Sequence, residues 1–234
     1  MKKTLFIFIL FLLQLSAVRA EVFWLSPLGK GGTSKSSIPL AERLPGVENA
    51  SPLLREPVKV NGKEFTLELF RSGASFDEMV QFLKKQGVGY AVSQDTLRCA
   101  VQLADGTVER LLIVRSPGSG PVTVFRIAGP PGVPQNAVWD SRLPALPAGT
   151  RALQVIHLPR RNSVYGIFDG NRTDPASAFR DIDQRLRSQG WQPAGNEGSP
   201  LAGGSGDIYY HRRGSRIMWV TCDSSGRGAF YCKN

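Results

Sequence analysis

The chain contains two helix-forming segments of similar pattern, and this repetition limits the folds open to it more than any other feature. Residues 76–86 (FDEMVQFLKKQ) and 179–189 (FRDIDQRLRSQ) each place apolar residues at helical spacing, and each precedes a glycine. Such spacing puts the apolar residues on one face of a helix, which must pack against another layer. The pattern therefore predicts two small α+β units, each with one helix packed on an antiparallel sheet.

The first unit is expected to span residues 58–128. Its helix starts at a capping box formed by Ser75 and Glu78, and it stops at Gly87. Alternating or apolar runs predict one strand before this helix and three after it, at residues 64–70, 96–103, 108–115 and 122–127. The unit thus has the order β-α-β-β-β.

The second unit, residues 151–234, is expected to repeat this order. Asp174 and Pro175 suit the N-cap and the first turn of its helix. Strands are predicted around the helix at residues 163–168, 207–213, 216–222 and 229–232. Duplication explains the match between the units. A generic likeness of amphipathic helices explains it as well, because helical periodicity alone fixes the apolar matches.

Proline and glycine mark the boundaries of the two units. Residues 27–57 are polar and broken by proline, so residues 21–57 are expected to form a flexible N-terminal arm. Residues 129–150 are rich in proline and glycine and separate two strand-rich regions, which predicts a linker.

The first twenty residues have the pattern of a secretory signal peptide. Two lysines precede an apolar run, and Val18 and Ala20 occupy the small-residue positions of a cleavage site before Glu21. An uncleaved membrane anchor is the alternative, but the apolar run is shorter than the roughly 20 residues that span a bilayer. We expect a bacterial periplasmic or secreted protein with no transmembrane segment in its mature chain.

The predicted compartment bears on the cysteines near the C-terminus, because disulfides persist in oxidising surroundings. If residues 216–222 and 229–232 form a hairpin with a three-residue loop at residues 226–228, Cys222 faces Cys232 at a separation that a disulfide spans. A metal clip and a redox-active pair are the alternatives, but further ligands and a Cys-x-x-Cys spacing are missing. Cys99 is expected to be a buried thiol in a strand.

The second unit also carries the candidate binding residues. The chain has a formal net charge of +10, and arginines and aromatic residues lie side by side in its last thirty residues. Because arginine pairs with carboxylates and stacks on aromatic rings, these residues suit an acidic or anionic partner. The candidates are Tyr209, His211, Arg212, Arg213, Trp219 and Tyr231. A merely solubilising surface is the alternative.

Strand alternation predicts which of these residues a partner can reach. Met218, Val220 and Phe230 share one apolar face, which is expected to receive Phe179, Ile182 and Leu186 from the helix. Trp219 and Tyr231 then lie on the other, more exposed face. This arrangement resembles an interface hot spot, in which aromatic anchors and arginine predominate.

No motif in the sequence indicates a reaction. His157 lies in an apolar strand, His211 lacks an adjacent nucleophile, and the glycine-rich residues 198–207 match no phosphate-binding or nucleophile loop. Asp181 and Asp183 are expected to pair with arginines on their own helix. We therefore expect no enzyme, no cofactor and no bound metal.

These features favour a non-enzymatic protein-binding module, such as a soluble accessory subunit of a secretion or pilus assembly in the cell envelope. A periplasmic inhibitor or immunity protein is the alternative within the binding class. A hydrolase or a binder of anionic envelope polymers is the alternative outside it. Export and a modest basic surplus disfavour nucleic acid as the partner.

Overall fold

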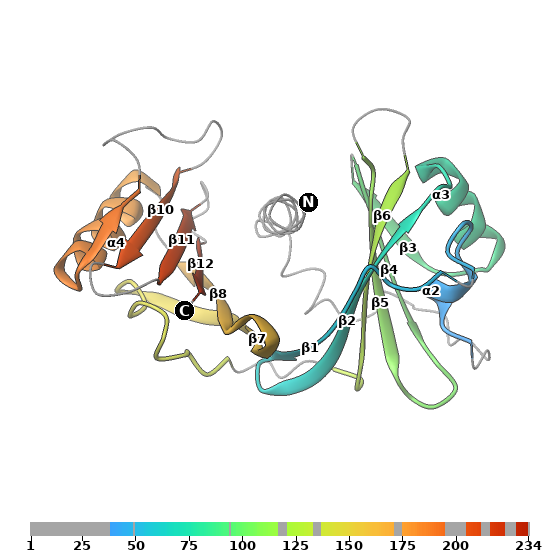
Figure 1. The fold of residues 1–234 in the computed structure, drawn as a ribbon, viewed down its shortest axis with the longest axis horizontal. Helices are drawn as coiled ribbons and strands as arrows, with labels where there is room; N and C mark the ends of the chain where they lie inside the picture. Colours follow the sequence, from blue (N-terminus) through green and yellow to red (C-terminus); the bar gives the residue numbers. More distant parts are fainter. Residues whose placement is uncertain are drawn as a thin grey trace. The chain divides into compact units, whose positions relative to one another are not determined.

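The computed structural model describes residues 38–48, 50–93, 95–116, 121–132, 137–170, 175–194, 205–211, 216–222 and 228–233 (Figure 1). Within this part the chain is dominated by antiparallel sheet and has few helices. Backbone pairing links the described strands in the order β3-β4-β5-β6-β2-β1-β7-β8-β12-β11-β10-β9. The chain divides into two compact units.

The N-terminal unit contains α2 (Leu40–Arg43), β1 (Leu54–Val60), β2 (Lys63–Ser72), α3 (Phe76–Lys85), β3 (Tyr90–Ser93), β4 (Thr96–Gln102), β5 (Val108–Val114) and β6 (Val122–Gly129). The C-terminal unit contains β7 (Thr150–Leu158), the 3-10 turn η1 (Pro159–Arg161), β8 (Ser163–Gly170), α4 (Pro175–Ser188), β9 (Trp191–Pro193), β10 (Ser205–His211), β11 (Ile217–Cys222) and β12 (Gly228–Lys233).

The tip of the β1–β2 hairpin, Lys59–Gly62, groups with the C-terminal unit. Lys59 and Val60 pair there with His157 and Ile156 of β7. Asn61 and Gly62 both have positive φ, as a two-residue hairpin turn requires. The Asn61 side chain also accepts a hydrogen bond from the backbone N–H of Val155 at 2.7 Å.

Both units have the same strand order and one helix between their second and third strands, but neither is the predicted β-α-β-β-β unit. Each adds one strand before the first predicted strand and one short strand after the helix. The sheet runs β1-β2-β6-β5-β4-β3 in one unit and β7-β8-β12-β11-β10-β9 in the other. The sequence conceals β3 and β9 because strands of four and three residues are too short to display alternation.

The helix α3 forms as predicted and builds the N-terminal core. The Ser75 and Glu78 side chains make the reciprocal hydrogen bonds of a capping box. Gly87 adopts the left-handed conformation at the helix end, with φ of 66°. Met79 and Leu83 are fully buried against β4 and β5, so this helix covers one face of the sheet.

The predicted arm is too long, because residues 38–57 are partly folded. Leu40, Ala41 and Leu44 are fully buried in the same core as α3. The backbone N–H groups of Leu40 and Ala41 donate to the Glu109 carboxylate at 2.6 and 3.0 Å. A buried carboxylate on β5 therefore holds the start of α2, a long-range contact that local composition does not encode.

The predicted linker is also partly folded. Trp139, Leu143 and Leu146 pack on the core of the C-terminal unit, and the Trp139 indole N–H donates to the Pro144 carbonyl oxygen at 2.7 Å. Prolines interrupt regular structure in this segment without preventing it from packing. Residues 137–146 thus belong to the second unit.

The C-terminal core is built as the sequence predicts. Ile182 and Leu186 of α4 pack with Met218, Val220 and Phe230. Asp181 and Asp183 pair with Arg185 and Arg187 one helical turn along. Asp174, the predicted N-cap, lies outside the described residues.

Among the described helices, none is long and apolar enough to cross a membrane.

Candidate binding surface of the C-terminal unit

The sheet of the C-terminal unit has two faces, which strand register identifies. Directly opposed residues on antiparallel strands point to the same side. One row of opposed residues lies on the side that α4 covers, which we call the helix-covered face. This row contains Tyr209, Met218, Cys232 and Val164. The neighbouring row points the other way and contains Ile208, Trp219, Tyr231 and Tyr165. We refer to that second side as the opposite face.

Tyr209 belongs to the core, contrary to its predicted role in binding. Its ring is fully buried beneath α4, and its hydroxyl donates to the Asp183 carboxylate at 2.8 Å. Arg187 donates to the same carboxylate. Tyr209 therefore ties β10 to the helix and is inaccessible to a partner.

An exposed apolar patch lies on the opposite face, across β10 and β11. Ile208, Tyr210 and Ile217 are 48%, 45% and 47% exposed. Tyr210 is directly opposite Ile217, and Ile208 is directly opposite the half-buried Trp219. We call these four residues the β10–β11 patch. Clustered exposed apolar side chains of this kind mark interaction sites more often than scattered ones do.

Trp219 and Tyr231 share this face, as predicted, but they differ in exposure. Tyr231 is only 6% exposed, so the expectation that a partner can reach it is wrong. Trp219 is half-buried, and its indole N–H has no acceptor within the described part of the chain. The accessible aromatic group of the patch is Tyr210, whereas the residue predicted from sequence was its neighbour Tyr209.

His211 lies at the end of β10, beside the edge strand β9. Its ring meets the Trp191 ring edge to face, with centroids 5.1 Å apart. Its Nε2 is 3.2 Å from the Gln189 carbonyl oxygen. These contacts fit a structural role at the turn after α4. Arg212 and Arg213, the neighbouring candidates, lie outside the described residues.

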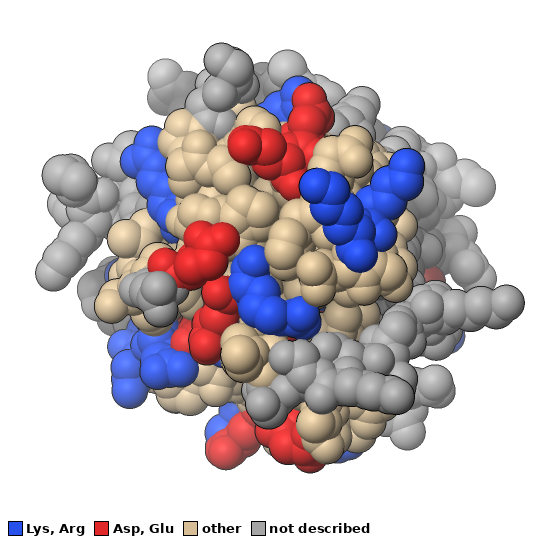
Figure 2. Space-filling model, turned by 90° about the vertical axis from the view of Figure 1, so that its right-hand side faces the viewer, with Lys and Arg blue, Asp and Glu red and all other residues tan. Residues whose placement is uncertain are grey.

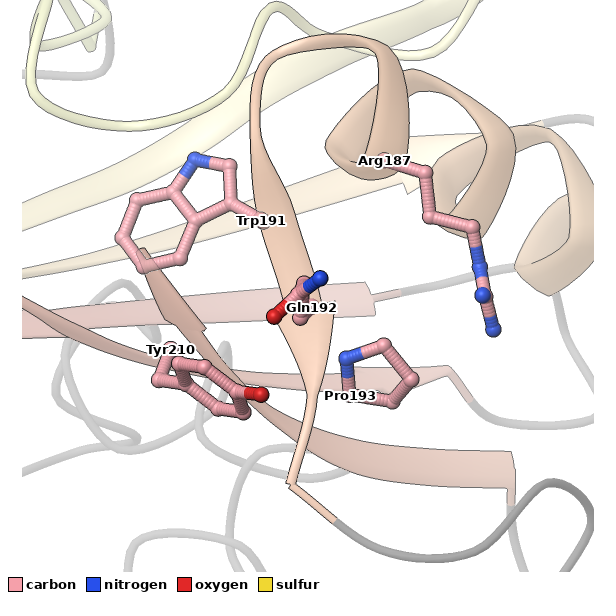
Figure 3. A pocket seen from close by; sticks show the side chains of 5 residues that line it. All are labelled: Arg187, Trp191, Gln192, Pro193 and Tyr210. Atoms are coloured by element: carbon pink, nitrogen blue, oxygen red, sulfur yellow. The ribbon is translucent and has the colours of Figure 1, made fainter. Parts of the chain in front are cut away.

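A shallow hollow of about 300 Å³ adjoins the patch (Figure 3). It is lined by Arg187, Trp191, Gln192, Pro193 and Tyr210. In Figure 3 the Tyr210 ring lies below Gln192, and Arg187 extends from α4 beside Pro193. Tyr210 thus belongs to both the patch and the hollow. The hollow can accept one side chain of a partner that covers the patch.

A polar cluster that local sequence patterns do not reveal holds the segment before β7 against the sheet. Arg142 forms two hydrogen bonds to the Asp140 carboxylate, both at 2.9 Å, and approaches His157 Nδ1 at 2.9 Å. The Arg142 hydrogen bonds lower the pKa of Asp140. Burial, together with the nearby Arg142 charge, lowers the pKa of His157. The histidine is therefore held neutral beside an ionised aspartate.

The predicted disulfide register is wrong. Cys232 pairs with Met218, whereas Cys222 pairs with Gly228. Four residues of strand separate the two positions by about 13 Å, well beyond the Cα separation that a disulfide allows. Gly228 belongs to the strand, where it pairs with Cys222 and Phe168, and the position requires glycine because the Phe168 ring fills the space where a Cβ would lie. The shift is even-numbered, so Phe230 and Met218 still share the helix-covered face.

Cys232 is a buried thiol next to the polar cluster. Burial raises its pKa, and the Arg216 guanidinium only partly offsets this effect. Cys99 is likewise buried, with a pKa raised by desolvation. Both thiols are therefore protonated and weakly nucleophilic near neutral pH. No group of three or more His, Cys, Asp or Glu side chains among the described residues is arranged to hold a metal.

Charge is distributed evenly on the surface in Figure 2, which belongs to the N-terminal unit. Lysines and arginines are interspersed there with aspartates and glutamates rather than gathered into one patch. A surface of this kind exerts no strong single-sign field on approaching molecules. The even distribution argues against charge as the main attraction at this surface.

Comparison with known proteins identified no family for this chain. No family model matches it, and no curated protein matches it. A solved structure with some likeness is the apo structure of the immunity protein TplEi of the T6SS from Pseudomonas aeruginosa. It is 9% identical, with a TM-score of 0.23, over 76% of this chain and 80% of that one.

Proposed function

We propose that this protein is an exported, non-enzymatic protein-binding module that acts as a soluble accessory subunit of a secretion or pilus assembly in the bacterial cell envelope. The observation that carries the proposal is the β10–β11 patch. Its four residues come from two adjacent strands, and three of them are nearly half exposed. A partner that covers this patch would remove aromatic and aliphatic surface from water.

The shape of the patch favours a protein partner over a small molecule. Small ligands are usually enclosed by concave pockets of roughly 300 to 1,000 Å³. The adjoining hollow is at the lower limit of that range, and the patch itself is a sheet face. An exposed aromatic residue flanked by aliphatic side chains is typical of the centre of a protein interface.

The environments of the reactive groups support a non-enzymatic role. Burial keeps the Cys232 thiol protonated, and His157 is engaged by Arg142 and Asp140. Neither group faces the β10–β11 patch, since Cys232 and His157 belong to the helix-covered side of the sheet through their pairing with Val164.

The test is affinity capture from envelope extract with the mature protein, in wild-type and Tyr210→Ala forms. Tyr90→Ala is the matched control, because Tyr90 is 38% exposed but lies on β3 of the other unit. We expect an envelope complex to bind the wild type and Tyr90→Ala and to be lost with Tyr210→Ala. Capture of one soluble enzyme would favour the inhibitor alternative. Equal capture by all three forms would reject the patch as the binding site.

A further inference from the structure

The N-terminal unit has a sheet face that neither described helix of the unit covers. Register places Leu67, Ile127 and Arg110 in one row of this face, and Leu69, Phe125 and Leu112 in the next. The core beneath α2 and α3 is formed by the residues that point the other way, such as Leu111 and Val124. We call the side that bears Arg110 the helix-free face.

This face is strongly apolar and excludes water. Its buried apolar members are Phe65, Leu69, Val108, Leu112, Phe125 and Ile127, each at most 8% exposed. Burial of such side chains away from water stabilises the folded chain. A face of this composition requires a cover, and no described element of this unit supplies one.

Arg110 lies within this face and is itself only 6% exposed. Its guanidinium lies 5.8 Å from the centre of the Phe65 ring. Its Nη1 has no hydrogen-bond acceptor in the described part of the chain. Burial accordingly lowers its pKa. A buried cation is costly unless it is paired and hydrogen-bonded, and the described residues offer no acceptor to Nη1, so an acceptor is needed here.

The other buried arginine of this unit shows what is missing. Arg126, on the helix-covered side, donates to Glu109 at 2.7 Å and also to Glu68. Glu56, a buried carboxylate on β1, cannot serve Arg110, because β2 and β6 lie between their strands. Three strand spacings amount to about 14 Å.

The sequence outside the described residues contains the complementary chemistry. Residues 21–25 read EVFWL, one carboxylate followed by four apolar residues. The thirteen residues from Leu25 to Ile38, where the described chain begins, can span up to about 43 Å. That length exceeds a ten-residue strand, which measures about 34 Å.

We infer that residues 21–25 bind the helix-free face of the N-terminal unit, with the Glu21 carboxylate pairing with Arg110 and the apolar residues covering Leu67, Ile127 and Phe125. The start of the mature chain is then a built-in third layer of this unit. This surface is distinct from the β10–β11 patch, and the inference does not depend on the proposed function.

A photo-crosslinking experiment on the full mature chain locates the segment. Leu67, which is half-buried beside Ile127, is replaced by the photoreactive amino acid p-benzoylphenylalanine. After irradiation, mass spectrometry is expected to find position 67 joined to a peptide that contains residues 21–25. Crosslinking to another segment, to a separate protein, to lipid or to nothing overturns the inference.

A double-mutant cycle tests the ion pair. Glu21→Gln is expected to lower the midpoint of thermal unfolding in the wild-type background and to have no effect in Arg110→Leu. The control is Glu64→Gln, an exposed glutamate on β2, which is expected to have no effect in either background. Additive effects of Glu21→Gln and Arg110→Leu overturn the pairing. The effect of Glu21→Gln is measured separately within each background, so the stability change that Arg110→Leu causes by itself cancels from the comparison.

Discussion

Tyr210 of β10 lies directly opposite Ile217 of β11, and both side chains are nearly half exposed. Its neighbour Tyr209 points to the other side and is fully buried. One residue of register thus separates a core tyrosine from a surface tyrosine. Tyr210 and Ile217 are two of the four residues of the β10–β11 patch. The predictions about binding depend on this pair.

Tyr210→Ala is expected to weaken binding to the captured envelope partner by about 2 kcal/mol, roughly 30-fold in Kd. The reason is the loss of exposed aromatic surface at the patch, with no loss from the core. Calorimetric titration gives Kd, and circular dichroism should show unchanged thermal unfolding. Trp219→Ala is expected to lower both affinity and stability, because Trp219 is half-buried. A Tyr210→Ala protein with unchanged affinity would contradict the role of the patch.

Cys232 is expected to remain a thiol in exported protein. The register sets it opposite Met218, so Cys222 lies too far along the hairpin to reach it. Burial also predicts slow alkylation of Cys232 and Cys99 in native protein and rapid alkylation in urea. Mass spectrometry after alkylation without reductant measures this. A peptide that joins Cys222 to Cys232 would restore the register predicted from sequence.

Export is expected to remove residues 1–20. The N-terminal lysines, the apolar run and the small residues Val18 and Ala20 form the recognition pattern. Cell fractionation and N-terminal sequencing should find mature protein that begins at Glu21 in the periplasm or the medium. The control is an Ala20→Arg precursor, which should accumulate uncleaved. Full-length wild-type protein in the cytoplasm would refute export.

Asp140→Asn is expected to destabilise the C-terminal unit by about 1 to 2 kcal/mol at pH 7, because it removes the carboxylate that accepts from Arg142. The pKa of Asp140 is lowered in the folded protein, first through its hydrogen bonds from Arg142. Its stabilising effect is therefore present above the unfolded pKa of about 3.9 and is lost as the pH falls through the folded value.

Urea unfolding of Asp140→Asn and wild type at several pH values measures this dependence. The two curves should converge below about pH 4. Asp77→Asn is the control, since Asp77 is 86% exposed and lies 3.5 Å from Arg115. Surface pairs of this kind contribute little, so this variant should resemble wild type at every pH. A pH-independent difference for Asp140→Asn would exclude the ion pair as its cause.

Local sequence patterns correctly predicted the helices and strands whose own residues contain a capping motif, a stop residue or a clear apolar periodicity. The capping box at Ser75 and the stop at Gly87 defined α3, and alternation assigned Met218 and Phe230 to the face beneath α4. These features depend on residues within a few positions of one another. Strands such as β3 and β9 are too short for this kind of reading.

Long-range contacts account for the rest. The prolines around α2 indicate an unstructured arm, but Glu109, almost seventy residues away, supplies the acceptor that holds this helix. The cluster of Asp140, Arg142 and His157 also escapes local patterns, because His157 lies fifteen residues along the chain from Arg142. Register likewise depends on a neighbour, since β12 pairs with β8 along its whole length.

Glu109 provides the sharpest test of how the N-terminal unit is assembled. Its fully buried carboxylate accepts from the backbone N–H groups of Leu40 and Ala41 and from Arg126. Glu109→Gln removes the negative charge and leaves Arg126 with Glu68 as its remaining carboxylate partner. Because a buried ion pair is broken from one side, we expect a loss of roughly 3 kcal/mol in the free energy of unfolding.

The position of the loss distinguishes this effect from general damage to the core. Amide hydrogen exchange should accelerate first at Leu40 and Ala41, since their N–H groups lose a charged acceptor. Glu64→Gln, an exposed neighbour on β2, should change stability by less than about 0.5 kcal/mol. Unchanged exchange at α2 in Glu109→Gln would show that other contacts hold this helix.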